Sequence, residues 1–240
     1  PAPLDDDTAT AIATTTSATA APLLVSLNGQ QFVGPLDFSV YEPPNVSTVW
    51  PASGELDAST VVRFSGKHLG GAGEALSCRV GGGGGSIVSA ALDASDGSLS
   101  CSLPASSGSG QQDATLELTA NGVDWYVVGS FRYLDAASLT GVSPASVSTS
   151  VSTVLSITGT GLRGGTHYAC RFSAAVEGSG DTPAAYDAVS GAIQCSLPAA
   201  VTADAAGSVT VSRNGIDFTS AGSLTLVSDE SPLATPASAV

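Results

Sequence analysis

The chain has 240 residues, of which 12% are charged and 42% are hydrophobic, and its formal net charge is −14. This apolar content is enough for a folded core and excludes a wholly disordered chain, while the acidic charge argues against nucleic acid and anionic membranes as partners. Because no run of 18 apolar residues occurs, we expect no direct membrane insertion. With 28 glycines, 13 prolines and few aromatic residues, the composition favours short strands joined by turns.

An internal repeat of 93 residues organises the chain. The dipeptide Asn-Gly occurs at Asn28-Gly29, Asn121-Gly122 and Asn214-Gly215, at a constant spacing of 93 residues. Further landmarks recur at this spacing or within one residue of it: Phe38, Phe131 and Leu224; Pro51-Ala52-Ser53 and Pro144-Ala145-Ser146; Phe64-Ser65-Gly66 and Ile157-Thr158-Gly159; Cys78 and Cys170; Cys101 and Cys195. We therefore predict that one structural unit has been copied in tandem.

Each repeat is predicted to consist of short strands. Residues 60–64 and 154–157 are β-branched runs that lead to a glycine. Residues 114–119 and 208–212 alternate between apolar and polar side chains and run into Asn-Gly, a pattern typical of a hairpin whose turn has positive φ at both central residues. About seven strands per ~90 residues, with frequent turns, are typical of an immunoglobulin-like sandwich. The predicted fold is therefore all-β, with tandem immunoglobulin-like β-sandwiches.

The motifs within each unit resemble those of the IPT/TIG domain, the immunoglobulin-like module of plexins and of many tandem-repeat surface proteins. The resemblance depends on Phe64-Ser65-Gly66 and its counterpart in the next unit, on Cys-x-Leu-Pro, on the Asn-Gly hairpin and on the closing Phe131-Arg132-Tyr133. It implies two complete units, residues 45–137 and 138–230. Residues 1–44 then resemble the C-terminal part of a preceding unit with a Thr-rich loop, and residues 231–240 a linker to a following segment of a longer chain.

Each complete unit holds two cysteines, Cys78 and Cys101 in the first and Cys170 and Cys195 in the second. Four cysteines allow three pairings, and since the motif is copied together with both of its cysteines, we predict one disulfide within each unit. Zinc binding is the alternative, but no paired histidines accompany the cysteines. Disulfides indicate an oxidising compartment, and the sequon at Asn45 is a candidate N-glycosylation site. We therefore expect an extracellular or cell-surface location.

No constellation of residues in the sequence indicates catalysis, so we predict that the chain is not an enzyme and has no catalytic, metal-binding or cofactor-binding residues. His68 and His167 lie in different motif positions, without the nucleophile and acid that a catalytic triad requires. Asp93 and Asp96 lie in a Gly/Ser-rich turn, where aspartate commonly bonds its own backbone. The glycine run 81–85 lacks the Lys-Ser/Thr of a phosphate loop and is predicted to be a connector.

Acidic and aromatic residues leave two binding alternatives. Asp5-Asp6-Asp7 could attract Ca²⁺, although a solvated acidic loop is the simpler interpretation. Trp50 and Trp125 could stack on a sugar. Phe32 and Phe218 occupy sites that match or nearly match that of Trp125, which favours a packing role for this position.

Short connectors join the units, at Glu42-Pro43-Pro44-Asn45 and at residues 136–140, and such connectors keep successive domains in a defined orientation. We therefore expect a structural segment of a stalk or fibre protein that assembles through domain packing, with other segments of its own chain and neighbouring chains as partners. The alternatives are an adhesin or receptor ectodomain that spaces or forms a ligand-binding surface, and a carbohydrate-binding module. Glycans at Asn45 or on residues 8–22 and 231–240 are further partners to test, and a ciliary surface is one candidate location.

Overall fold

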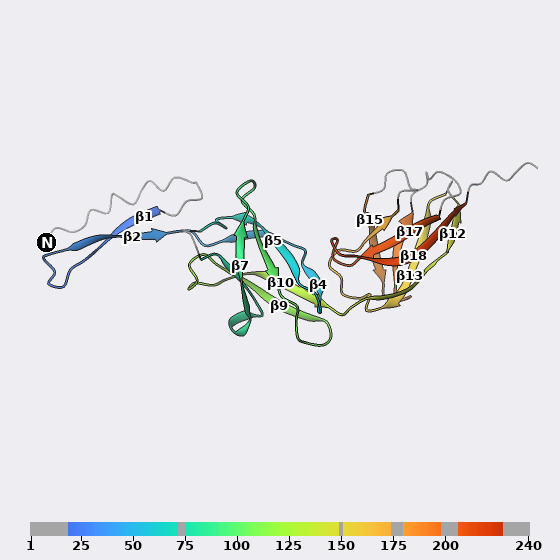
Figure 1. The fold of residues 1–240 in the computed structure, drawn as a ribbon, viewed down its shortest axis with the longest axis horizontal. Coiled ribbons are helices and arrows are strands. Elements are labelled where there is room, and N and C mark those ends of the chain that lie inside the picture. The colour runs from blue at the N-terminus through green and yellow to red at the C-terminus, as the bar shows by residue number, and fades with distance from the viewer. Residues whose placement is uncertain (1–18, 72–74, 149–150, 174–179, 198–205, 228–240) are drawn as a thin grey trace, which may run out of the picture. The chain divides into compact units, whose positions relative to one another are not determined.

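The computed structural model describes residues 19–71, 75–148, 151–173, 180–197 and 206–227. Within these ranges the regular structure consists of strands joined by turns and loops, and the helical structure is confined to one 3₁₀ turn, Gly82–Gly84. The strands form one two-stranded sheet and two eight-stranded sheets (Figure 1). The predicted all-β class is thereby confirmed.

The first eight-stranded sheet does not follow the order of its strands in the sequence. Its strands are β3 (Asn45–Trp50), β4 (Ser53–Glu55), β5 (Thr60–Lys67), β6 (Ser77–Val80), β7 (Ser86–Leu92), β8 (Leu99–Leu103), β9 (Gln112–Thr119) and β10 (Tyr126–Leu134). Their order across the sheet is β3-β5-β8-β7-β6-β9-β10-β4. The β-branched run predicted at 60–64 lies in β5, and the alternating run at 114–119 lies in β9.

The second eight-stranded sheet repeats this order strand for strand. Its strands are β11 (Ser138–Ser143), β12 (Ser146–Ser148), β13 (Thr153–Thr160), β14 (Ala169–Phe172), β15 (Thr182–Asp187), β16 (Ala192–Leu197), β17 (Ala206–Ser212) and β18 (Phe218–Val227). Their order is β11-β13-β16-β15-β14-β17-β18-β12. Each sheet has one strand more than the sequence indicated, because β4 and β12 have three residues each and are too short to show a periodicity.

One strand of each eight-stranded sheet changes partner midway along its length. In β7, residues 86–89 pair with β6 and residues 90–92 pair with β8. In β15, residues 182–183 pair with β14 and residues 184–187 pair with β16. A strand that changes partner in this way forms the corner at which a sheet folds over to enclose a core. Each sheet thereby supplies both layers of a sandwich.

Aliphatic and aromatic side chains fill the core of the second sheet. Leu224 and Leu226 replace the aromatic pair of the first unit and are 2% and 1% exposed. The buried members of this core are Val147, Leu155, Ile157, Leu162, Cys170, Phe172, Ile193, Cys195, Leu197, Val209, Val211, Ala221, Leu224 and Leu226.

Two disulfides join Cys78 to Cys101 and Cys170 to Cys195, which is the pairing that the repeat predicts. In both sheets the two cysteines lie on the strands that flank the partner-switching strand. Each bond therefore ties the two layers of a sandwich together. The bonded residues are 23 and 25 positions apart, and closing loops of this length stabilises a fold by about 3 kcal/mol in the chain-entropy model.

By their contacts, the residues group into two compact units. The first takes residues 1–50, 61–103 and 115–130, and the second takes residues 51–60, 104–114 and 131–240. The two large sheets run from β3 to β10 and from β11 to β18. The domain limits predicted at 45, 138 and 231 remain predictions.

The three Asn-Gly sites form the same turn, which the asparagine side chain stabilises. Asn121 Oδ1 accepts hydrogen bonds from the backbone N–H groups of Val123 and Asp124 at 2.9 and 2.8 Å. Asn28 and Asn214 accept the corresponding two bonds. Only the glycine of each dipeptide has positive φ, so the expectation of positive φ at both residues is wrong. Asparagine acts here through its side chain, in a loop longer than two residues.

A close approach of two backbones accounts for the glycine of the Phe-Ser-Gly and Ile-Thr-Gly motifs. A Cβ atom on Gly66 would overlap the carbonyl oxygen of Asn45, and one on Gly159 would overlap the carbonyl oxygen of Ser138. At both places the first strand of the sheet has an irregular register against its neighbour. The motif therefore marks the point where this irregular strand passes close to the next one.

We expect Gly66→Ala to lower the free energy of unfolding by about 2 kcal/mol, because the backbone of β3 must move to relieve the overlap. Gly83→Ala is the matched control, since a Cβ atom there meets nothing within 4 Å. Urea denaturation followed by circular dichroism measures both variants. Equal midpoints for the two would show that β3 shifts without cost.

Candidate functional site

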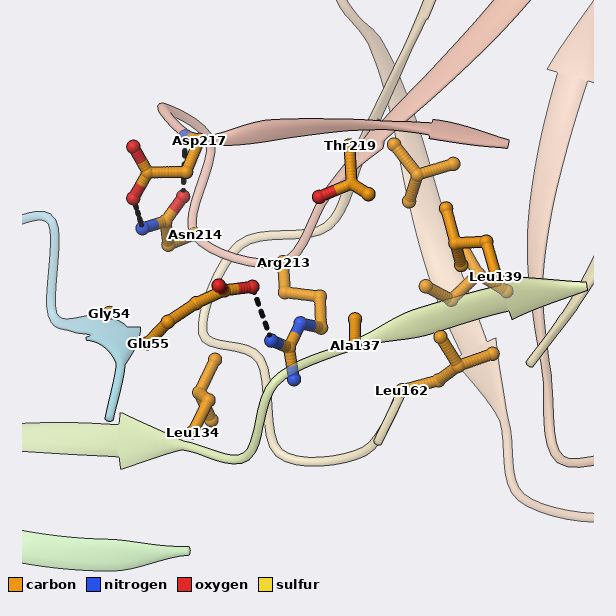
Figure 2. A pocket seen from close by; sticks show the side chains of 12 residues that line it. Gly54, Glu55, Leu134, Ala137, Leu139, Leu162, Arg213, Asn214, Asp217 and Thr219 are labelled. Atoms are coloured by element: carbon orange, nitrogen blue, oxygen red, sulfur yellow. Dashed lines mark hydrogen bonds and ion pairs between the residues drawn. The ribbon is translucent and has the colours of Figure 1, made fainter. Parts of the chain in front are cut away.

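The candidate site is a pocket in the second compact unit, which includes β4 and residues 131–134 of the first sheet. Figure 2 shows Glu55, the last residue of β4, facing Arg213, which lies in the turn between β17 and β18. Leu134, Ala137 and Leu162 line the apolar side of the pocket. The pocket thus combines an ion pair with an apolar wall.

Arg213 is the centre of the polar contacts in this pocket. Its side chain is 7% exposed, and its Nη2 donates to Glu55 Oε1 at 2.9 Å and to the carbonyl oxygen of Asp135 at 2.8 Å. Its Nη1 donates to the carbonyl oxygen of Gly161. A buried guanidinium is stable only when acceptors compensate for its lost hydration, and these three acceptors do so.

Asn214 adds a second connection beside Arg213. Its Nδ2 donates to the carbonyl oxygen of Ser53 at 3.0 Å and to Asp217 Oδ2 at 2.8 Å, and Ser53 Oγ lies 2.8 Å from Thr166 Oγ1. These polar groups of the pocket are bonded to other atoms of the same chain. The arrangement therefore fastens residues 51–60 to the turn between β17 and β18, which is a structural role rather than a chemical one.

A second repeated feature pairs an arginine with an aromatic ring. The guanidinium carbon of Arg79 lies 4.2 Å from the ring centroid of Trp125, and that of Arg171 lies 3.9 Å from the ring centroid of Phe218. Such contacts combine cation–π attraction with burial of the ring face. The position of Trp125 therefore has the packing role that the sequence favours over sugar stacking.

The same two arginines lower the pKa values of their carboxylate partners. Arg79 Nε donates to Glu117 Oε2 at 2.6 Å, and this hydrogen bond holds the pKa of Glu117 below its usual range against the opposing effect of desolvation. The hydrogen bond from Arg171 likewise lowers the pKa of Asp181. The side chains of Arg79 and Glu117 are 15% and 11% exposed, so solvent screens this pair only in part.

The predicted glycosylation site is accessible. Asn45 is exposed and is the first residue of β3, where it pairs with Lys67 of β5. Ser47, the third residue of the sequon, is also exposed and donates through Oγ to the carbonyl oxygen of Ser65 at 2.9 Å. Occupancy of this site by a glycan remains a prediction.

The two histidines and the two aspartates weighed from the sequence do not come together in one site. His68 Nδ1 lies 2.8 Å from a carboxylate oxygen of Glu42, whereas the backbone of His167 bridges to the turn after β17. Asp93 and Asp96 accept hydrogen bonds from backbone N–H groups two residues later. Hydrogen bonding by the side chain and the backbone N–H of Ser95 lowers the pKa of Asp93, and the side chain and backbone N–H of Ser98 lower the pKa of Asp96.

The acidic run and the glycine run are the remaining sequence candidates. Asp5-Asp6-Asp7 lies outside the described residues, and the glycine run 81–85 forms the 3₁₀ turn Gly82–Gly84 between β6 and β7. In the part of the chain that the structure describes, no three His, Cys, Asp or Glu side chains are grouped to hold a metal ion. No helix among the same residues has the length and hydropathy of a membrane span.

Arg213 and Glu55 were not identified from the sequence. Arg213 stands one repeat after Ala120, and both residues are buried. Comparing the two units therefore shows a charged residue in the second where the first has a small buried one. This difference indicates that the second copy of the turn makes a contact that the first does not.

We expect the stabilising effect of Glu117 to depend on pH. Because its pKa is lower in the folded state than in the unfolded state, its contribution is fully present above about pH 4.3 and is lost as the pH falls through the folded-state value. Wild type should therefore have a higher urea midpoint than Glu117→Gln at pH 7, and the gap should narrow below about pH 4. A gap that stays constant down to pH 3 would contradict the effect of the Arg79 hydrogen bond.

Comparisons with known proteins give one matching domain family and several solved structures of low similarity. No curated protein matches the chain. The plexin A4 extracellular region is similar over 78% of this chain and 16% of its own, at 15% identity and a TM-score of 0.46. The Bacteroides ovatus glucan-utilisation protein SGBP-B, solved with a mixed-linkage heptasaccharide, is similar over 81% of this chain and 50% of its own, at 14% identity and a TM-score of 0.33.

Structural similarities with identities and TM-scores this low do not identify a family. The family assignment therefore rests on the sequence model. The model of the IPT/TIG domain matches residues 44–133, which agrees within one residue at each end with the span of the first eight-stranded sheet, 45–134. Residues 44–133 of this chain are therefore an IPT/TIG domain.

Proposed function

We propose that the chain is a structural segment of an extracellular or cell-surface stalk or fibre, in which tandem IPT/TIG-like units assemble through domain packing. In this proposal residues 45–137 and 138–230 are two complete units, and residues 1–44 are the C-terminal part of a preceding unit. Residues 231–240 lead to a following segment. The second eight-stranded sheet supports this assignment, because it has the strand order of the first.

The observation that carries the proposal is the set of hydrogen bonds around Arg213. Only residues 135–137 separate β10 from β11, and Arg213 binds the carbonyl oxygen of Asp135 within this connection. The same guanidinium binds Glu55 and Gly161. A connection of three residues that is hydrogen-bonded in this way retains little conformational freedom. A spacer depends on such stiffness, because a flexible joint does not hold distant parts of a protein apart.

The extracellular location is supported by the two disulfides, since such bonds persist in oxidising compartments. The exposed sequon at Asn45 is compatible with the same location. The partners in this proposal are other segments of the same chain and neighbouring chains. A ciliary surface is one location among those that fit.

The alternative of a carbohydrate-binding ectodomain requires aromatic rings that are free to stack on a sugar. The ring of Trp125 carries the guanidinium of Arg79 on its face, and that of Phe218 carries Arg171. Because Trp125 and Phe218 are used for internal packing, they support the spacer role. The rings left to the carbohydrate-binding alternative include Trp50 and Phe32, which are 41% and 61% exposed.

We expect Arg213→Ala to loosen the connection at 135–137 and to lower the free energy of unfolding by about 2–3 kcal/mol, because three acceptors lose their donor. Small-angle X-ray scattering should give one narrow distribution of maximum dimension for the wild type and a broader one for the variant. Arg63→Ala is the matched control, since it removes an exposed arginine that pairs with the exposed side chains of Asp93 and Asp96. A wild-type distribution as broad as that of Arg213→Ala would overturn the spacer role.

The location is tested by intact mass of the protein secreted from eukaryotic cells. We expect reduction to add four hydrogens, one pair for each disulfide, and peptide N-glycosidase to remove a glycan that is absent from Asn45→Gln. Four free thiols together with an unmodified mass would contradict the extracellular location.

A further inference from the structure

The hairpin formed by β1 (Thr19–Val25) and β2 (Val33–Val40) is a sheet of two strands, and no third strand among the described residues pairs with it (Figure 1). One of its faces is apolar and open to solvent. Leu23, Val25, Phe38 and Val40 on this face are 48%, 47%, 57% and 53% exposed. A contiguous apolar surface of this kind indicates an interaction site.

This hairpin has the same pairing register as the hairpin β17–β18. Leu23 pairs with Leu36, and 186 residues later Val209 pairs with Gly222. The pairs made by residues 20, 21 and 25 also recur at this spacing, and in both hairpins the register becomes irregular directly after Leu23 and Val209. The two hairpins are therefore the same structural element, and equivalent residues can be compared directly.

The residues equivalent to the exposed face are buried in both complete units. They are Val209, Val211, Leu224 and Leu226 in one unit and Leu116, Leu118, Phe131 and Tyr133 in the other, and none is more than 5% exposed.

The strand that pairs with the hairpin has the same pattern in both units. β6 contributes Cys78-Arg79-Val80 against β9, and β14 contributes Cys170-Arg171-Phe172 against β17. The cysteine lies opposite Leu118 or Val211, so a strand of this kind on β1 would place its cysteine opposite Val25.

Phe32 supplies an independent indication of the kind of strand that would pair with β1. It stands 93 residues before Trp125, the ring on which Arg79 stacks, and 186 residues before Phe218, the ring on which Arg171 stacks. Phe32 itself is 61% exposed. An arginine that follows the cysteine of the incoming strand would lie over this ring.

We propose that the face of β1–β2 binds an extended strand of sequence Cys-Arg-aliphatic or Cys-Arg-aromatic, supplied by the β3–β8 portion of an IPT/TIG-like unit. The strand adds antiparallel to β1, with its cysteine opposite Val25, its hydrophobic residue opposite Leu23 and its arginine over Phe32. The proposal deepens the proposed function, on which it depends, by naming the partner of this hairpin. A second copy of the hairpin fits less well, because residues 19–40 contain neither arginine nor cysteine.

The test fuses a second copy of residues 45–103 to the N-terminus of the complete chain, so that its last leucine precedes Pro1 as Leu103 precedes Pro104. We expect the backbone amides of β1 and β2 to exchange with solvent about 100-fold more slowly in the fusion than in the unfused chain. A third disulfide should also form. Phe38→Asp should abolish this protection, whereas Ser39→Asp, on the opposite face, should leave it in place.

A second measurement does not depend on the fusion. A peptide spanning residues 75–81 with Cys78→Ser is titrated into the complete chain, and nuclear magnetic resonance should show shifts of the β1 amides. The same peptide with Arg79→Ala should bind at least about 5-fold more weakly, because it loses the stacking contact.

Two outcomes overturn the proposal. In one, neither the fusion nor the peptide protects or shifts β1. In the other, light scattering shows that the unfused chain is a dimer that Phe38→Asp makes monomeric, so that the occupant is a second copy. Neither measurement involves the connection at 135–137, so a failure here is distinguishable from a failure of the proposed function.

Discussion

The pairing of the Cys-Arg strand with the first strand of the Asn-Gly hairpin is the constraint on which each unit depends. Alternation along this strand sends the cysteine into the core and the arginine to the outer face. The cysteine then bonds across the sandwich, and the arginine stacks on the ring that follows the turn. A shift of one residue in this register would exchange the two side chains and lose both contacts. Disulfide, stacking and hairpin turn therefore require the same register.

The sequence predicts those parts of the fold that recur. Asn121 and Cys78 have counterparts at the repeat spacing or within one residue of it, and repetition alone indicates that they belong to one unit. The sequence could not predict contacts that occur in one unit and have no counterpart in the other. Arg213 replaces Ala120 of the preceding unit and binds carbonyl oxygens of Asp135 and Gly161, which no side-chain pattern encodes. The turn type was also missed, because the φ preference of Asn-Gly does not reveal that Asn121 acts through its side chain.

The two cores show how a departure from the motif is accommodated. The second unit has Leu224 and Leu226 where the first has an aromatic pair, and it has Phe172 where the first has Val80. Phe172 is buried in one cluster with both leucines. A larger residue on one strand thus offsets smaller residues on another, and cores tolerate such exchanges when the total volume is kept. Replacing the aromatic pair therefore redistributes the side-chain volume of the core without a loss of packing.

The charge distribution limits what can hold such chains together. Of seven basic residues against 21 acidic ones, five arginines are engaged in ion pairs within the chain: Arg63, Arg79, Arg132, Arg171 and Arg213. The carboxylates outnumber these basic partners and leave a net charge of −14, so neighbouring copies repel one another within about 8 Å at physiological salt. In the proposed assembly, attraction between units would therefore come from apolar faces and strand edges. The hairpin β1–β2 has this character, because Asp37 is the one charged residue between positions 19 and 40.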